Sequence, residues 1–385
     1  MRKLIYIFMI VLMMGLLIGP GVPAQAQQPK VWKIGAVIPI TGPGSVFGEA
    51  GRNSALMFQE EINGSGGING VPIEVIIYDD QSSESKAVLS VNKLIDNDGV
   101  VAIIGSYLTG PVMAILPVVQ KAEIPLIACS GSSPPVEPIR KWVFKTPYTD
   151  RKATERYLMD MKKRGITKLA ILSVSNALGD SVSKHFNEQA PEMGIKIVAH
   201  ERHEQKDTDM SVQLTKIRAT DAQAIVGAVV GPPAAIISKN HQQLGMKIPI
   251  YLWYGVGDQT FLDMAGDAAN GVRVAASKYI APEQLPDSDP LKSYILSVKE
   301  KYEKKYGTKT SNMHVGGARD ALSIIVQAIR QGGKDPASIR DQIVKVRNLK
   351  GIWGVYNITE DDHVGLDPRD LIMVEVKNRK WVLLN

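Results

Sequence analysis

The chain has 385 residues, with 45 basic and 39 acidic side chains, a net charge of +6 and a single cysteine. This small basic excess is spread along the chain and gives no footprint for nucleic acid, so we expect no nucleic-acid partner. One cysteine excludes an intrachain disulfide bond, and the fold must therefore depend on apolar cores. Cys129 lies in the segment IPLIACS, which favours a buried small side chain over a nucleophile.

Residues 1–26 have the layout of a secretory signal peptide. Arg2 and Lys3 form a basic start, an apolar run extends from Leu4 to Ile18, and the small residues AQA end at Ala26. The apolar run is too short to span a bilayer comfortably. Cleavage after about Ala26 leaves 385 − 26 = 359 residues, enough for two domains. We therefore expect an exported, periplasmic protein without direct membrane insertion.

Apolar strands alternate with helical patterns along most of the chain. In the first half, strands are expected at residues 33–40, 72–80, 100–106 and 124–130. After residue 150 the rhythm restarts, with strands expected at residues 168–175, 195–200, 222–230 and 248–255. Ile, Val and Leu fill these strands almost continuously, as in parallel sheets that are covered on both faces. The pattern predicts an α/β fold with two doubly wound parallel-sheet lobes.

The last hundred residues follow a different pattern. Three helices are expected at residues 290–307, 316–333 and 335–346. The remainder indicates short antiparallel strands, with turns at Gly365 and Asn378.

The segment TGPGSVFGEAG, residues 41–51, joins a predicted strand to a predicted helix. A dinucleotide-binding loop needs a third glycine, which lets the helix and strand pack closely. In the frame set by Gly42 and Gly44 that position holds Phe47, and Gly48 comes one residue late. A bulky ring would then point at the phosphates, so the segment argues against a nucleotide site.

The sequence assembles no catalytic or metal site. In HERHE, residues 200–204, Glu204 stands where the zinc protease motif requires its second histidine, and we interpret the segment as a solvated loop. A Walker loop and a Gly-x-Ser-x-Gly nucleophile elbow with plausible partners are both missing. We therefore expect no enzymatic activity, no metal and no cofactor.

Two other loops leave the carboxyl ends of predicted strands, GSYLTGP at residues 105–111 and IACSGSSPP at residues 127–135. Ligands of open α/β sheets bind outside this edge. Thr109 lies just before a helix expected from Pro111, so its hydroxyl and nearby N–H groups are suited to a carboxylate. The alternative is that Thr109 and Ser132 only cap helices.

From about Lys33 to the C-terminus, the chain resembles the periplasmic substrate-binding proteins of the branched-chain amino acid ABC transporter family. Three segments carry the resemblance: residues 34–82, which include the glycine loop, the GGING turn and the YDD strand end, and the segments IGSYLTGPV and IPLIACSGSSP. The resemblance implies a type I periplasmic binding fold, in which two lobes joined by a three-segment hinge enclose one small molecule. It also implies delivery of that ligand to the permease subunits of an ABC importer.

The resemblance further implies lobe boundaries and hinge positions. The N-terminal lobe would comprise residues 31–146 and 277–354, and the C-terminal lobe residues 147–276 and 355–385. Hinges are expected near Thr146–Pro147, Ala276–Lys278 and Val355–Asn357.

The same resemblance implies roles for individual residues. Thr109 and Ser132 match the hydroxyl donors to a ligand carboxylate, Ser130 the backbone acceptor for an amino group, and Phe47 the aromatic wall. The other residues expected at the site are Tyr107, Gly131, Tyr148, Leu178, Val230, Tyr254, Asp258, His314 and Arg319.

The second half departs from the family pattern, which leaves two ligand classes open. Leu178 stands where an amino-acid binder often has tyrosine, and the acid that pairs with the ligand ammonium is missing near Tyr254. Arg319 replaces a tyrosine and is suited to an anion, unless it forms a surface or interlobe salt bridge. The ligand is then a small hydrophobic amino acid of branched-chain type, with Asp258 as substitute acid, or an aromatic or aliphatic carboxylate without an α-amino group. For the carboxylate, His314 and Arg319 would form a polar or cationic end.

Overall fold

The computed structural model of the protein describes residues 30–308 and 311–384. The expected signal peptide at residues 1–26 lies outside these ranges. Among the helices within them, none combines the length and the apolar character that crossing a bilayer requires.

The first half of the chain forms a five-stranded sheet in the order β2-β1-β3-β4-β5. All of its neighbouring strands are parallel, and Ile34 of the first strand aligns with Val75 on one side and Ala102 on the other. The strands are β1 (Trp32–Ile38), β2 (Ile73–Asp79), β3 (Ala102–Gly105), β4 (Leu126–Ala128) and β5 (Val143–Lys145). The four strands predicted in this half are confirmed, whereas β5 was not predicted.

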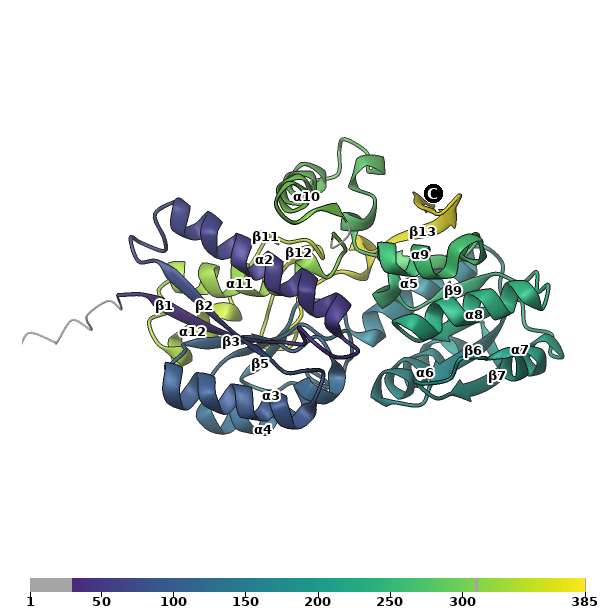
Figure 1. The fold of residues 1–385 in the computed structure, drawn as a ribbon, viewed down its shortest axis with the longest axis horizontal. Helices are drawn as coiled ribbons and strands as arrows, with labels where there is room; N and C mark the ends of the chain where they lie inside the picture. Colours follow the sequence, from purple (N-terminus) through teal and green to yellow (C-terminus); the bar gives the residue numbers. More distant parts are fainter. Residues whose placement is uncertain (1–29, 309–310, 385) are drawn as a thin grey trace, which may run out of the picture. The chain divides into compact units, whose positions relative to one another are not determined.

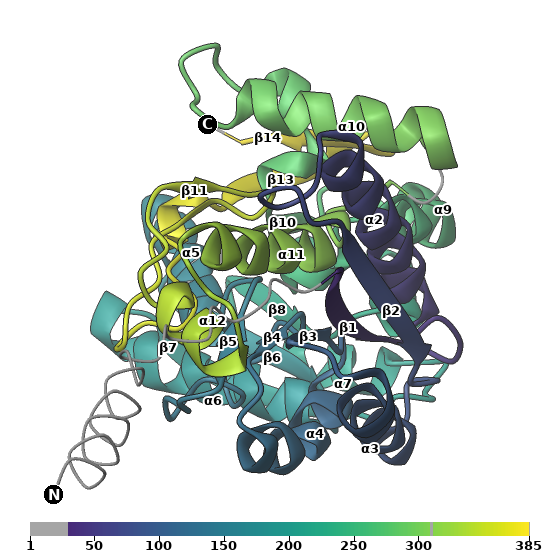
Figure 2. The same ribbon diagram turned by 90° about the vertical axis from the view of Figure 1, so that its left-hand side faces the viewer.

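Helices cover both faces of this sheet, which explains why its strands are apolar at almost every position (Figure 1, Figure 2). On one face, α2 (Ser45–Gly64) packs against α11 (Val315–Arg330), and α3 (Glu84–Lys93) packs against α4 (Thr109–Ala122) on the other. Next to α2 lies α10 (Lys292–Tyr306), and α12 (Pro336–Ile343) packs on α11. The buried face of α2 includes Ala55, Phe58 and Ile62, as the sequence predicts.

The second half forms a seven-stranded sheet in the order β14-β13-β10-β9-β8-β6-β7. Its parallel strands are β6 (Lys168–Val174), β7 (Lys196–His203), β8 (Ala224–Ala228), β9 (Ile250–Leu252) and β10 (Arg273–Ala276). The antiparallel pair β13 (Ile372–Lys377) and β14 (Lys380–Leu383) extends one edge through a turn at Asn378, which has a positive φ. A separate antiparallel pair is β11 (Leu349–Lys350) and β12 (Val355–Tyr356).

In this half one helix precedes β6, and the others connect the parallel strands in turn. These helices are α5 (Asp150–Lys163), α6 (Ala177–Gln189), α7 (Ser211–Arg218), α8 (Pro232–Gln243) and α9 (Gln259–Ala265). Contacts join α5 to α6, and α8 to both α7 and α9. The strands of the two sheets fall on either side of the boundaries expected at residues 146 and 276. The complete lobe bounds stay a prediction.

The HERHE segment is strand, so the expectation of a solvated loop is wrong. Pairing with β6 continues as far as His203, whose side chain is buried. A ring nitrogen of His200 lies 2.8 Å from the Ser173 hydroxyl on β6. The segment is rich in charged residues because β7 is an edge strand, in which alternate side chains face solvent. Within the described ranges, no group of three or more His, Cys, Asp or Glu side chains is placed to hold a metal.

Candidate functional site

The strand order places the candidate loops. In the first sheet the connection from β1 runs to β2 on one side, while β3 lies on the other side of β1. Loops at such a reversal diverge and leave room outside the carboxyl ends of the strands. The second sheet reverses in the same way at β6, between β7 and β8. The segments that follow β1, β3, β6 and β8 are therefore where a ligand is expected.

The glycine loop after β1 is fixed by the end of β2. Gly42 has a φ of +84°, and a Cβ there would lie 2.7 Å from the Gln81 carbonyl oxygen, so glycine is required. Asp79 Oδ1 accepts from Ile40 N at 2.9 Å and from Thr41 N at 3.2 Å. The Asp79 carboxylate is thus bound to the loop backbone.

Thr109 and Ser132 lie together, as the sequence predicts. Thr109 Oγ1 donates to Ser132 Oγ at 2.9 Å, although the two loops are 23 residues apart. Thr109 is the first residue of α4, and no side chain caps this helix. The capping alternative is therefore wrong for Thr109, whose hydroxyl remains beside the exposed N–H groups of a helix N-terminus. This is a favourable position for a carboxylate.

Ser130 has unused hydrogen-bonding capacity. Its side chain is buried, yet its hydroxyl has no partner among the described residues. Buried hydroxyl groups are nearly always hydrogen-bonded, so an orphan needs an explanation. Because Ser130 lies two residues before Ser132, the orphan adjoins the Thr109–Ser132 pair.

Phe47 and His314 form an aromatic contact at the start of α2 and α11. Their ring centroids are 4.5 Å apart. Nε2 of His314 lies 3.2 Å from the Gly255 carbonyl oxygen, so this nitrogen must carry the proton. Burial lowers the pKa of His314 to about 4. The imidazole is therefore neutral at physiological pH and offers a polar rather than a cationic end.

Tyr254 connects the two sheets. Its hydroxyl lies 3.1 Å from the Gly131 carbonyl oxygen and 2.9 Å from that of Tyr148, and it shares one proton between them. A Cβ on Gly131 would lie 2.3 Å from this hydroxyl, so only glycine permits the approach. The Tyr148 hydroxyl is itself directed elsewhere and donates to Trp353 O at 2.7 Å.

Two expected site residues, Tyr107 and Asp258, have other partners. The Tyr107 hydroxyl accepts from Ala318 N at 2.8 Å and holds α11 against the first sheet. Asp258 is the N-cap of α9 and accepts from Phe261 N at 2.7 Å. Burial raises its pKa to about 6.

Arg319 is the clearest correction. Its guanidinium forms a 2.7 Å ion pair with Glu61 and lies over the Phe58 ring. Glu61 is 14 residues beyond Phe47 in α2, which is ~21 Å of helix. These contacts argue against the expected cationic end of the ligand site at this position. The salt bridge that does form is neither the surface pair nor the interlobe pair of the alternative, because Arg319 is buried and both partners belong to helices of the first sheet. Leu178, in the first turn of α6, and Val230, in the loop after β8, are half-buried, and Val230 packs against Gly255.

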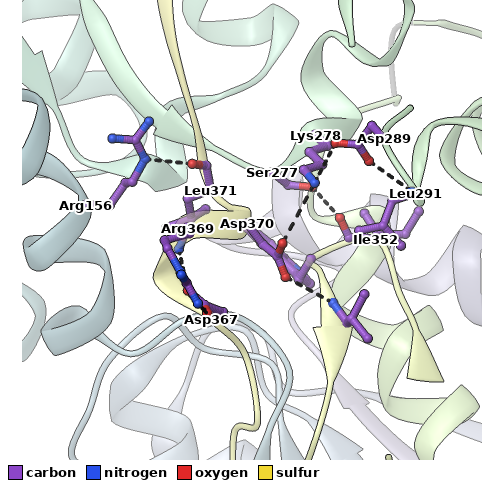
Figure 3. Close-up of polar contacts among 12 residues, drawn as sticks. Arg156, Ser277, Lys278, Asp289, Leu291, Ile352, Asp367, Arg369, Asp370 and Leu371 are labelled. Atoms are coloured by element: carbon purple, nitrogen blue, oxygen red, sulfur yellow. Dashed lines mark hydrogen bonds and ion pairs between the residues drawn. The ribbon is translucent and has the colours of Figure 1, made fainter. Parts of the chain in front are cut away.

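Polar contacts tie the expected hinge segments together (Figure 3). Ser277 Oγ donates to Ile352 O at 2.5 Å. Lys278 Nζ lies 2.8 Å from Asp289 Oδ2 and 3.8 Å from Asp370 Oδ1. Asp370 in turn accepts from Val355 N at 3.3 Å. One buried lysine thus connects the segments expected to act as the second and third hinges.

A buried polar cluster beside residue 148 was not predicted. Asp150 is fully buried, and its Oδ2 accepts from Ser181 Oγ at 2.5 Å and from Ser133 N at 3.2 Å. Lys145 is also fully buried and donates to the carbonyl oxygens of Pro147 and Tyr148. An acid in the first turn of a helix is commonplace, so the sequence carries no signal for this cluster.

The chain matches the family described as periplasmic binding protein over residues 31–380, and it belongs to that family. Its fold is the type I periplasmic binding fold. Among curated relatives, a leucine-, isoleucine-, valine-, threonine- and alanine-binding protein of Pseudomonas aeruginosa is 26% identical over 333 residues, which cover 84% of each chain.

Solved structures give the same assignment. An extracellular ligand-binding receptor of Rhodopseudomonas palustris is 29% identical, with a TM-score of 0.84 over 92% of this chain and 100% of that one. A branched-chain amino acid transporter substrate-binding protein of Streptococcus pneumoniae, in complex with isoleucine, has a TM-score of 0.80 over 92% of this chain and 99% of that one. At 22% identity, the latter likeness concerns the fold alone.

Proposed function

We propose that the protein is the extracytoplasmic solute-binding component of an ABC importer. It captures one small hydrophobic amino acid of branched-chain type between its lobes and delivers it, chemically unchanged, to the permease subunits. The observation that carries this proposal is the Thr109–Ser132 hydroxyl pair at the N-terminus of α4, beside the orphan hydroxyl of Ser130. Family membership and the printed names of the relatives support the same ligand class.

A second ligand class is an organic carboxylate without an α-amino group. One observation keeps this class open: Asp258, the acid expected to receive the ammonium, caps α9. A buried ammonium without a counter-charge would be costly.

A thermal-shift panel tests the proposal, with each amino acid paired with its deaminated analogue, such as leucine with 4-methylpentanoate. A ligand present at 100 to 1,000 times its Kd stabilises the folded protein by roughly 3–4 kcal/mol. We expect leucine, isoleucine or valine to raise Tm, and mass spectrometry to recover the ligand intact. Stabilisation by the deaminated acids alone would select the second class, and a converted product would contradict a transport role.

A further inference from the structure

An amino acid brings a cationic amino group into the site, and a buried cation needs an anionic partner. In the loop after β9, the carboxylate of Asp258 is not free to be this partner, because it already caps the N-terminus of α9. The requirement for a partner therefore directs attention to the other buried acids near the Thr109–Ser132 pair.

Asp150 satisfies the geometric conditions. It begins α5, directly after the first expected hinge, and its carboxylate contacts the backbone N–H of Ser133. Adjacent Cα atoms are ~3.8 Å apart, so this contact lies one residue from Ser132. The hydroxyl of Ser181, in the helix that begins beside Leu178, donates to the same oxygen, Oδ2. Asp150 thus lies between the loop that follows β4 and α6 of the second half.

The other carboxylate oxygen has no partner. Asp150 Oδ1 is buried and makes no hydrogen bond to any residue of the described ranges. An unpaired carboxylate oxygen in the interior is costly unless a donor arrives. Together with the orphan Ser130 hydroxyl, it leaves two buried polar atoms near the Thr109–Ser132 pair without partners.

The charged groups around Asp150 leave its carboxylate without a paired cation, as binding of a ligand ammonium requires. Lys145 faces it but gives its hydrogen bonds to the carbonyl oxygens of Pro147 and Tyr148, and the two side chains form no ion pair. Glu137 and Tyr254 also face the carboxylate, and Glu137 adds negative charge. Burial raises the pKa of Asp150 and lowers that of Lys145, because both lose water around their charged forms.

We propose that Asp150 is the counter-charge for the ligand's α-amino group and that it sets the preference for amino acids over plain carboxylates. This inference rests on the proposed function and assigns the missing acid to the start of α5 instead of the loop after β9. The ligand ammonium donates to Oδ1, while Oδ2 keeps its bonds to Ser133 and Ser181.

The test compares Asp150→Asn with wild type, using leucine and 4-methylpentanoate as probes in isothermal titration calorimetry. Asparagine has the same shape and keeps an oxygen acceptor for Ser133 and Ser181, but it carries no charge. We expect the Kd for leucine to rise about 10- to 100-fold, as for a lost hydrogen bond to a charged group. The Kd for 4-methylpentanoate should change less than about twofold, because the Thr109–Ser132 pair is untouched. Ser181→Ala, which keeps the charge of Asp150, is the matched control. It should raise the Kd for both ligands equally, by about fivefold at most.

Proton linkage supplies a second measurement on the wild-type protein. An arriving ammonium lowers the pKa of Asp150, so leucine binding near neutral pH should release protons, measured as a dependence of the binding enthalpy on the buffer. Asp150→Asn should reduce this release, and 4-methylpentanoate should cause none.

Equal weakening of both probes in Asp150→Asn, or an unchanged Kd for leucine, would overturn the inference. Leucine binding to wild type without proton release would overturn it even if the variant did not fold. A wild-type protein that binds 4-methylpentanoate but not leucine would overturn the inference and leave solute binding in place. Failure to bind any amino acid or carboxylate of the panel would overturn the proposed function itself.

Discussion

The loops of the five-stranded sheet and those of the seven-stranded sheet present opposite kinds of polar group. Among the described residues, the hydroxyl groups of Thr109 and Ser132 bond to one another, and the hydroxyl of Ser130 has no partner. On the other sheet, Tyr254 is bonded to two carbonyl oxygens and Asp258 to a helix N-terminus. Polar side chains without a partner in the fold are free to bind a ligand. Those that already form hydrogen bonds within the fold instead shape the site and connect its two sides.

Substitution of Arg319 should have the largest effect, and this effect should be on stability and not on ligand binding. Arg319→Met removes the partner of the largely buried Glu61 and should lower the free energy of unfolding by about 2–4 kcal/mol. Ligand affinity should not change, because the pair lies far along α2 from Phe47. Urea unfolding and calorimetric titration measure the two quantities. The double variant with Glu61→Gln removes both charges and should recover part of the loss, whereas weakened ligand binding would return Arg319 to the site.

Burial makes protonation of His314 costly in the folded protein, although Nε2–H can donate to the Gly255 carbonyl oxygen in either charge state. Its folded pKa of about 4 lies below the ordinary value of about 6.5, so the unfolded chain takes up the proton first as the pH falls. This residue's contribution to stability is therefore complete above pH ~6.5 and is lost as the pH falls towards ~4, by up to roughly 3 kcal/mol.

His314→Gln isolates this contribution, because glutamine keeps an N–H donor for the Gly255 carbonyl and does not titrate. The Tm advantage of wild type over the variant should shrink between pH 6.5 and pH 4. The pKa of four other histidines is also lowered by burial, but these residues are present in both proteins and cancel in the difference. Parallel curves of Tm against pH would contradict the prediction.

Thr109→Val tests the free groups of the first sheet. Valine has the shape of threonine, so the fold should persist, but the hydroxyl that meets Ser132 is lost. If this hydroxyl donates to a carboxylate, binding should weaken by about 1.5–3 kcal/mol for amino acid and deaminated analogue alike. Calorimetric titration at one pH measures both ligands, and unchanged affinities would remove Thr109 from the site.

The comparison also explains how far the sequence predicts the molecule. Continuous apolar strands and amphipathic helices define both sheets, and Thr109 and Ser132 were found because their loops follow parallel strands. The partners of Arg319, Asp150 and Tyr107 were not predictable. Each is bonded to a residue far away in the chain, such as Glu61 or Ala318, and no local pattern encodes such a pair. The sequence thus predicts the location of a polar side chain when the strand order alone determines it, and not when it depends on a distant partner.

Asp258→Ser should have the smallest effect. It tests whether Asp150 or Asp258 receives the ligand ammonium. Serine is as good an N-cap as aspartate, so α9 should keep its cap, and the free energy of unfolding should change by less than about 0.5 kcal/mol. If Asp150 receives the ammonium, the Kd for leucine should also remain within about twofold of wild type, since Asp258 contributes no bond to the ligand. A tenfold rise in the Kd for leucine, with that for 4-methylpentanoate unchanged, would place the counter-charge on Asp258. The loop after β9 would then supply a charged group to the ligand after all, and the contrast between the loops that follow the strands of the two sheets would fail.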